Sequence, residues 1–280
     1  MINGALRSLL TNLIDYAGLF PPAGLSLEGT LRNYRHYATS ENEWALGRFV
    51  LPLARLAEFE QLRAEAGAQI PLSFVGVQPD ELAGLQLPGD SLEIKVARPE
   101  QIVSAMRDLP RGYSASFEIP LGANVDEFMM TLADAGGRAK IRTGGLTGDM
   151  FPTGASIAHF LASAARNKVA FKATAGLHHP LRAVHNFTYE PGSARGLMHG
   201  FVNVFFAAAA VFHGASEQDA ERILAESSPE AFCLTETSIG WKELVLTDPQ
   251  IIRARREFAI SFGSCSFEEP LQDLKALGWL

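Results

Sequence analysis

Residues 92–96 read Leu-Glu-Ile-Lys-Val, and residues 139–143 read Ala-Lys-Ile-Arg-Thr. In both stretches charged residues alternate with aliphatic ones, which is the period-two pattern of a β-strand with one polar and one apolar face. Residues 114–119 (Ser-Ala-Ser-Phe-Glu-Ile) and 169–174 (Val-Ala-Phe-Lys-Ala-Thr) alternate in a similar way. The pattern predicts four adjacent strands that share one polar face.

Four further runs of β-forming residues lie outside this stretch, and helix-length amphipathic segments separate most of the runs. Such an order predicts parallel strands, and eight of them close a barrel. An open doubly wound sheet is the alternative, but no Gly-x-Gly-x-x-Gly follows the first strand. We expect one α/β domain over residues 1–280, a (β/α)8 TIM barrel. The predicted strands are Leu13–Phe20, Arg48–Leu51, Leu72–Val77, Leu92–Val96, Ser114–Ile119, Ala139–Thr143, Val169–Thr174 and Ala259–Ser264.

Apolar residues at spacings of three and four predict the outer helices, as at Leu82–Leu85 and around Phe128 and Leu132. The interval between the seventh and eighth strands is much longer than the others. It holds a predicted helix, Met198–Phe212, and an acidic stretch, Ser216–Glu226. We expect a long helical insertion here that forms a lid or an oligomer interface.

Composition limits the classes of partner. The chain has 280 residues, a net charge of −7 and no run of Lys or Arg, so neither nucleic acid nor an anionic membrane is expected. Its longest apolar run, Phe201–Phe212, is too short to span a bilayer, which needs about 20 residues. Two cysteines make no disulfide framework, and no signal peptide is recognisable near Met1. We expect a cytoplasmic protein with a small soluble ligand.

The polar face has two explanations, a buried ion-pair network that fixes strand register or a functional site. Buried ion pairs rarely add stability, because desolvation costs several kcal/mol per ion, so charges at the catalytic end of a barrel favour function. Two carboxylates among four cations predict an anionic ligand, a phosphate or a carboxylate. The residues on this face are Glu93, Lys95, Ser116, Glu118, Lys140, Arg142, Lys172 and Thr174.

Three segments carry a resemblance to a known family. They are Leu13–Pro21 (Leu-Ile-Asp-Tyr-Ala-Gly-Leu-Phe-Pro), Lys140–Gly144 (Lys-Ile-Arg-Thr-Gly) and Phe171–Gly176 (Phe-Lys-Ala-Thr-Ala-Gly). In order and in strand assignment they resemble the deoxyribose-phosphate aldolases, which are class I (Schiff-base) aldolase barrels. The resemblance implies a carbon–carbon lyase that needs no cofactor and acts on a small anionic carbonyl substrate, a sugar phosphate or an oxo-acid.

By this resemblance Lys140 forms the Schiff base, and Lys172 is the neighbouring cation that lowers its pKa. A like charge within about 4–6 Å, together with desolvation, is what makes a lysine neutral and nucleophilic near pH 7. Glu118 or Glu93 would then move protons, and Asp15 would support the site from the first strand.

Other positions depart from the family. Arg142 replaces a small hydroxyl residue, and Tyr16-Ala17 replaces His-Thr, which argues against deoxyribose phosphate itself as the substrate. The seventh strand ends in Gly-Leu-His-His-Pro rather than in a plain glycine turn. The residues expected to bind the substrate are Lys95, Arg142, Thr174, Gly144, Gly145, His178, His179 and Ser264.

Two alternatives remain open. A metal enzyme could use His178 or His179 with Cys265 or a carboxylate, but adjacent residues of an extended segment point in opposite directions, and we assign no metal ligand. A non-catalytic barrel could bind an anionic metabolite while Lys140 and Lys172 stay protonated and paired. Cys265 is expected to be a small packing residue, because no histidine can be assigned beside it.

Overall fold

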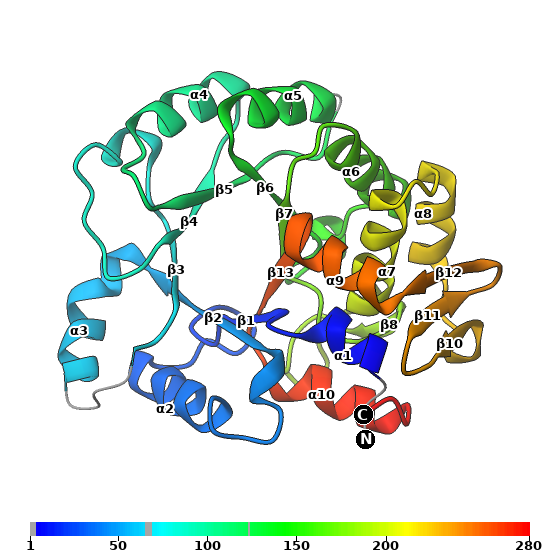
Figure 1. Cartoon of the computed structure of the whole chain (residues 1–280). Coiled ribbons are helices and arrows are strands. Elements are labelled where there is room, and N and C mark those ends of the chain that lie inside the picture. Colours follow the sequence, from blue (N-terminus) through cyan, green and yellow to red (C-terminus); the bar gives the residue numbers. More distant parts are fainter. Residues whose placement is uncertain (1–3, 65–68, 123) are drawn as a thin grey trace.

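The computed structural model describes residues 4–64, 69–122 and 124–280, and within them eight parallel strands close a barrel (Figure 1). The strands follow one another around the barrel in chain order, and the last, β13, closes it between β7 and β1. The predicted eight-stranded barrel is confirmed. Its strands are β1 (Ile14–Tyr16), β2 (Leu46–Pro52), β3 (Leu72–Val75), β4 (Ser91–Lys95), β5 (Ser114–Glu118), β6 (Arg138–Arg142), β7 (Phe171–Thr174) and β13 (Ala259–Ser264).

Helices surround this barrel and bury their apolar faces against it. The stripe predicted around Phe128 and Leu132 is confirmed, since both side chains are buried. The helices of the described residues are α1 (Gly4–Leu10), α2 (Leu27–Tyr37), α3 (Leu56–Ala64), α4 (Pro99–Asp108), α5 (Val125–Ala135), α6 (Gly154–Arg166), α7 (Phe201–Phe212), α8 (Glu217–Ala225), α9 (Asp248–Glu257) and α10 (Glu268–Ala276). Short 3-10 turns are η1 (Glu43–Ala45), η2 (Leu53–Arg55), η3 (Pro79–Glu81), η4 (Gly148–Met150) and η5 (Pro229–Ala231).

The helix predicted at Leu82–Leu85 is wrong. Between β3 and β4 the chain forms only the turn η3, and it leaves that turn through Gly84, whose φ is +76°. This left-handed conformation favours glycine and does not continue a helix. Leu82 is buried and Leu85 is partly buried, so the apolar spacing reflects two contacts of a loop with the core.

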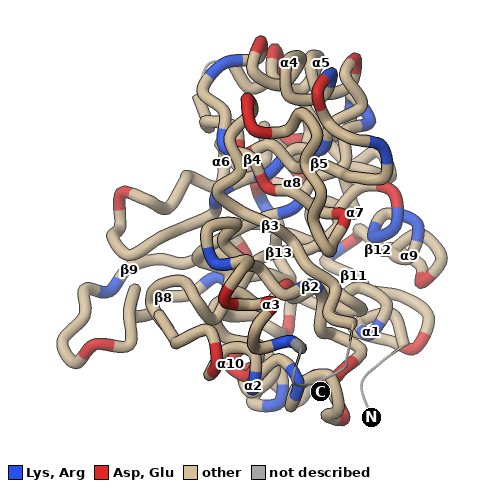
Figure 2. The backbone as a smooth tube through the Cα atoms, turned by 90° about the vertical axis from the view of Figure 1, so that its left-hand side faces the viewer, with Lys and Arg blue, Asp and Glu red and all other residues tan. Residues whose placement is uncertain are grey.

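The interval between β7 and β13 is a mixed α/β segment rather than a helical insertion. It contains α7, α8 and α9, but also the antiparallel hairpin of β8 (Ala183–Asn186) and β9 (Arg195–Met198). A second antiparallel sheet consists of β10 (Phe232–Leu234), β11 (Ser238–Trp241) and β12 (Leu244–Thr247). Figure 2 shows β8 and β9 projecting from one end of the barrel, with α1 and the sheet of β11 and β12 toward the other.

The apolar helix α7 belongs to the ring around the barrel. The rings of Phe201 and Phe205 lie 5.5 and 5.8 Å from that of Phe262 on β13, and α6, α8 and α9 also contact the helix. Its residues from Phe201 to Val211 are buried by the chain itself, so α7 is neither a lid nor an exposed oligomer face. The acidic stretch at 216–226 forms α8. No helix in the described ranges is both long and apolar enough to cross a membrane.

The period-two pattern places the polar residues inside the barrel. Alternate residues of β4 to β6, such as Leu92, Phe117 and Ile141, are fully buried and belong to the hydrophobic core. The register between strands then sets the position of the polar residues along the barrel axis. Glu118 on β5, for example, pairs with Lys140 on β6. Lys140 in turn pairs with Lys172, so Glu118, Lys140 and Lys172 are neighbours on three adjacent strands.

Candidate active site at the carboxyl end of the barrel

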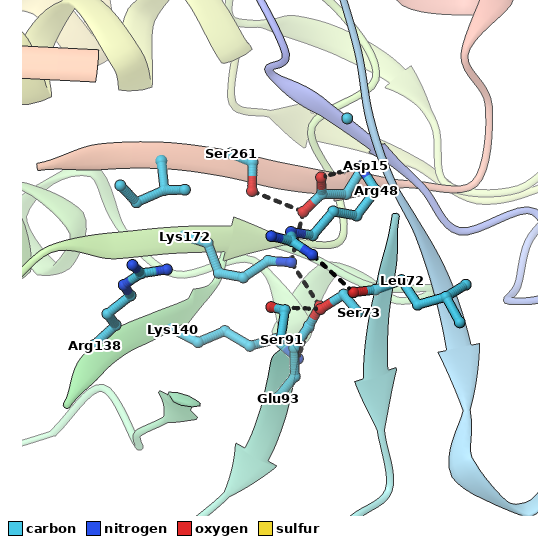
Figure 3. Close-up of polar contacts among 12 residues, drawn as sticks. Asp15, Arg48, Leu72, Ser73, Ser91, Glu93, Arg138, Lys140, Lys172 and Ser261 are labelled. Carbon is cyan, nitrogen blue, oxygen red and sulfur yellow. Dashed lines mark hydrogen bonds and ion pairs between the residues drawn. The ribbon is translucent and has the colours of Figure 1, made fainter. Parts of the chain in front are cut away.

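Two buried lysines form the centre of the candidate site. Lys140 and Lys172 are register partners on β6 and β7. The Nζ of Lys172 lies 2.7 Å from Asp15 Oδ2 and 2.5 Å from Glu93 Oε1. The Nζ of Lys140 lies 2.9 Å from Glu93 Oε2 and 2.8 Å from Glu118 Oε2. Glu93 therefore bridges the two lysines, and Figure 3 shows both side chains directed toward it.

Neighbouring strands hold the two deepest carboxylates in place. Ser73 donates a hydrogen bond of 2.7 Å to Glu93 Oε1, and Ser261 donates one of 2.7 Å to Asp15 Oδ2 (Figure 3). The backbone N–H of Arg48 donates to Asp15 Oδ1 at 2.8 Å. A Cβ at Gly47 would overlap Asp15 Oδ1, so this position admits no side chain without a shift. The carboxylates are preorganised by hydrogen bonds as well as by charge.

The ionised forms of these groups stabilise one another. Burial alone would raise the pKa of Glu93, but the charges of Lys140 and Lys172 outweigh it and hold that pKa well below its usual range. The pKa of Glu118 is also lowered, by Lys140 against the effect of burial. Burial alone would lower the pKa of Lys172, but Asp15 and Glu93 outweigh it and raise that pKa. Lys172 is thus a cation whose charge two carboxylates already balance.

A cavity of about 430 Å³ opens above this cluster. Arg142 stands at its wall with its Nε 3.0 Å from Glu118 Oε1, and 43% of its side chain is exposed. Its outer guanidinium nitrogens have no ion-pair partner among the described residues and could bind a ligand. Lys95 is exposed at the end of β4 and forms no ion pair with any described residue, so it lies at the rim rather than in the connected cluster. The charged and polar lining residues are Gln78, Glu93, Lys95, Glu118, Lys140, Arg142, Thr174, His178 and Cys265.

The β8–β9 hairpin supplies a wall that the sequence analysis missed. Phe187, which follows β8, and Met198, at the end of β9, both line the cavity. The ring of Phe187 stacks on that of Phe151 at 5.0 Å. A signal was present, because Pro191-Gly192 between two short β-forming runs is typical of a hairpin turn.

The two glycines after β6 differ in role. A Cβ at Gly144 would lie 2.8 Å from the Cα of Gly176, so this glycine allows two loops to pack closely, and it does not line the cavity. Gly145 does line the cavity. Only the second of the predicted pair could present its backbone to a ligand.

Ser264 and His179 also lie away from the cavity lining. Ser264 is buried at the end of β13, where its hydroxyl accepts a hydrogen bond of 3.3 Å from the backbone N–H of Ser266. His179 has its Nδ1 2.6 Å from Asp273 Oδ2, and its ring stacks on that of His185. Their predicted contact with the substrate is not supported by this placement.

His178 points the other way and reaches the cavity. Its Nδ1 lies 2.8 Å from Glu269 Oε2 on α10, and its Nε2 lies 4.0 Å from the Sγ of Cys265. Burial alone would lower the pKa of His178, but Cys265 and Glu269 outweigh it and raise that pKa to about 9. The expectation that Cys265 lacks a histidine beside it is wrong, since β7 and β13 are neighbours in the barrel and their following loops meet.

No local pattern could have identified Glu269, which lies 91 residues from His178 in the chain. In the parts of the chain described, no three His, Cys, Asp or Glu side chains converge in a way that could hold a metal ion. The rings of His178 and His179 have different acidic partners, Glu269 and Asp273.

Comparison of the chain with models of protein families, with curated proteins and with solved structures gave no match. The aldolase resemblance therefore depends on its three segments alone. These segments contribute Asp15, Lys140 and Lys172, which lie within one network of ion pairs.

Proposed function

We propose that the chain is a carbon–carbon lyase that acts through a Schiff base on Lys140, with a small anionic aldehyde or ketone as its substrate. The observation that supports this best is the placement of Lys140. Lys140 lines the cavity, and its Nζ lies 2.9 Å from Glu93 and 2.8 Å from Glu118. An amine that forms an imine needs a group within hydrogen-bond reach that takes and returns protons.

Glu118 suits this proton transfer better than Glu93. Lys140 must lose its proton before it attacks a carbonyl carbon, and Glu118 is a carboxylate in the cavity lining that can accept this proton across a contact of 2.8 Å. Glu118 returns this proton to the hydroxyl that leaves as water when the imine forms. Ionised again, it takes the proton of the substrate hydroxyl while the carbon–carbon bond breaks and its electron pair moves into the iminium. Glu93, held by both lysines and Ser73, positions Lys140.

The cavity favours an anionic substrate although the chain carries a net charge of −7. Lys172 lies below the lining and is balanced by Asp15 and Glu93, so it adds little positive charge to the cavity. Two carboxylates still face four cationic side chains in the lining. These cations are Lys95, Lys140, Arg142 and His178.

Reductive trapping tests the proposal. The protein is incubated with small anionic aldehydes and ketones, both sugar phosphates and oxo-acids, then reduced with borohydride and mapped by peptide mass. We expect an adduct on Lys140, none in Lys140→Met, and an unchanged yield in Lys275→Met, a surface control. Glu118→Gln should slow trapping by about 10²–10⁴-fold, the usual contribution of a positioned acid–base group.

A non-catalytic barrel that binds an anionic metabolite is the second candidate, favoured by the two carboxylates that pair with Lys140. Compounds that raise the melting temperature but leave no adduct on any lysine would support it. An adduct on Lys95 instead of Lys140 would move the chemistry to β4 and contradict our assignment.

A further inference from the structure

A second group of reactive side chains lies at the same cavity, on the side of β7 and β13. Cys265 follows β13, His178 follows β7, and Glu269 lies in the first turn of α10. Cys265 and His178 are both buried, and both line the cavity. The proposed lyase chemistry uses neither of them as a nucleophile.

Their contacts form a chain from carboxylate to imidazole to thiol. Glu269 Oε2 lies 2.8 Å from His178 Nδ1, and His178 Nε2 lies 4.0 Å from Cys265 Sγ. A carboxylate at Nδ1 fixes the hydrogen on that nitrogen and turns Nε2 toward the sulfur. This is the order of orienting group, base and nucleophile found in enzymes that act through cysteine.

The carboxylate in turn is held from two directions. Tyr189, in the loop between β8 and β9, donates a hydrogen bond of 2.9 Å to Glu269 Oε2 and lies 3.8 Å from Cys265 Sγ. The backbone N–H of Glu269 donates to Ser266 Oγ at 3.1 Å. Glu269 is therefore fixed by the hairpin and by its own helix terminus.

Other titratable groups border this cluster. Tyr16 reaches it from β1, and Glu268 belongs to α10 together with Asp273, which pairs with His179. His178, whose raised pKa favours the imidazolium, lies in contact with the sulfur. One proton can pass from the thiol to Nε2 across this contact, and the thiolate that results is the nucleophilic form.

We propose that Cys265 is a second nucleophile of this cavity, which adds reversibly to the carbonyl carbon of a small anionic aldehyde. In this step the sulfur forms a bond to the carbon, the π pair of the carbonyl moves to its oxygen, and that oxygen takes a proton from His178 Nε2. The product is a thiohemiacetal, and no oxidant, reductant or further reactant is needed. Glu269 acts as a positioning residue for the imidazole.

This inference goes beyond the proposed lyase activity and does not depend on it. Lys140 and Cys265 face one cavity of about 430 Å³, so one small carbonyl compound meets both an amine and a thiol. The products of the two steps can be distinguished. Borohydride converts an imine into a stable adduct on the lysine, but it leaves no such adduct from a thiohemiacetal. Each can therefore fail without the other.

Alkylation by iodoacetamide at pH 7, read by peptide mass, tests the thiol directly. The exposed Cys233 of the same chain is the internal control. We expect Cys265 to react at least tenfold faster than Cys233 although it is buried. His178→Gln should slow Cys265 at least tenfold, and Glu269→Gln several-fold, while Cys233 keeps its rate in both. Equal rates of Cys265 in the wild type and His178→Gln would overturn the proposal.

The ligand class is tested with glyoxylate, an anionic aldehyde, in the Lys140→Met variant, which cannot form the imine at that position. Glyoxylate should protect Cys265 from iodoacetamide in a concentration-dependent way and leave Cys233 unprotected. Dilution should restore the original rate, because the addition is reversible. Fast alkylation of Cys265 without any protection by glyoxylate, in this variant and in the wild type, would refute the assignment of an aldehyde as its ligand.

Discussion

Two clusters border one cavity but are built differently. The lysine cluster consists of Asp15, Glu93, Glu118, Lys140 and Lys172, and the thiol cluster of Cys265, His178, Glu269 and Tyr189. Strands supply the first, and only 5% of the Lys172 side chain and 2% of the Glu93 side chain are exposed. A loop, a helix and a hairpin turn supply much of the second, in which 28% of the Glu269 side chain is exposed. Barrel register fixes the positions of the lysines, whereas the packing of α10 and of the hairpin fixes Glu269 and Tyr189.

The difference has an energetic consequence. Charges deep inside a barrel are costly to leave unpaired, because no water replaces the lost partner. A charge near the rim costs less to leave without its partner, since solvent screens it. We therefore expect substitutions in the lysine cluster to cost stability first, and those at the rim to cost mainly chemistry or ligand affinity.

Lys172→Met should have the largest effect on stability. It leaves Asp15 and Glu93 buried without the cation between them, and breaking one side of a buried pair costs about 3–5 kcal/mol. The free energy of unfolding from urea denaturation measures this loss. Lys275→Met, at an exposed pair, should stay within about 0.5 kcal/mol of the wild type. A loss below about 1 kcal/mol for Lys172→Met would remove the proposed contrast between the two clusters.

Protonation of His178 should have the next largest effect on stability. We expect it to make the free energy of unfolding depend on pH. Its pKa is raised to about 9 in the folded state, above the ordinary value of about 6.5. The protonated imidazole therefore stabilises the fold fully below about pH 6.5, and this contribution is lost as the pH rises through about 9. We expect about 1–3 kcal/mol of such loss, because one pKa unit corresponds to about 1.4 kcal/mol.

Unfolding free energies of the wild type and of His178→Gln, measured between pH 6 and 10, isolate this contribution. The variant should lack the part of the alkaline decline that the imidazole causes, while the titration of other groups is common to both proteins. Parallel curves for the two proteins would mean that Cys265 and Glu269 do not hold His178 as a cation.

The two clusters were also unequally predictable from the sequence. Period-two alternation was enough to place Glu93, Glu118, Lys140 and Lys172 inside the barrel, because a strand allows only two directions for a side chain. The same rule would have found Ser73, which alternates with Leu72 and Phe74 on β3. The predicted polar face comprised only β4 to β7, and β3 has no charged residue that would have extended it.

Asp15 was predicted only through the family resemblance, because β1 is short and all three of its residues are buried. The Cys265–His178 contact could not be predicted, since it requires knowledge of which loops meet above the barrel. Glu269 lies on a helix whose rotation is set by tertiary packing. Local sequence therefore predicts the strand-borne site well and the loop-borne site poorly.

Arg142 joins the buried cluster to the exposed rim, and its substitution should have the smallest effect on stability. It pairs with Glu118, a member of the buried cluster, yet 43% of its side chain is exposed. Arg142→Gln should therefore cost under about 1 kcal/mol of unfolding free energy, as for other exposed pairs. The affinity of this variant for inorganic phosphate should nevertheless fall about tenfold. The reason is that the Arg142 guanidinium is the most exposed cation bonded to the buried ion-pair cluster.

The shift of melting temperature with phosphate concentration reports this affinity, since a ligand that binds only the folded state stabilises it by mass action. Lys275→Met is again the matched control and should keep the wild-type shift. If Arg142→Gln loses stability as Lys172→Met does but binds phosphate normally, Arg142 is a structural member of the buried network. If Arg142→Gln instead keeps its stability and loses affinity for phosphate, the boundary between residues that stabilise the fold and residues that bind a ligand lies at Glu118, where the buried cluster meets the cavity.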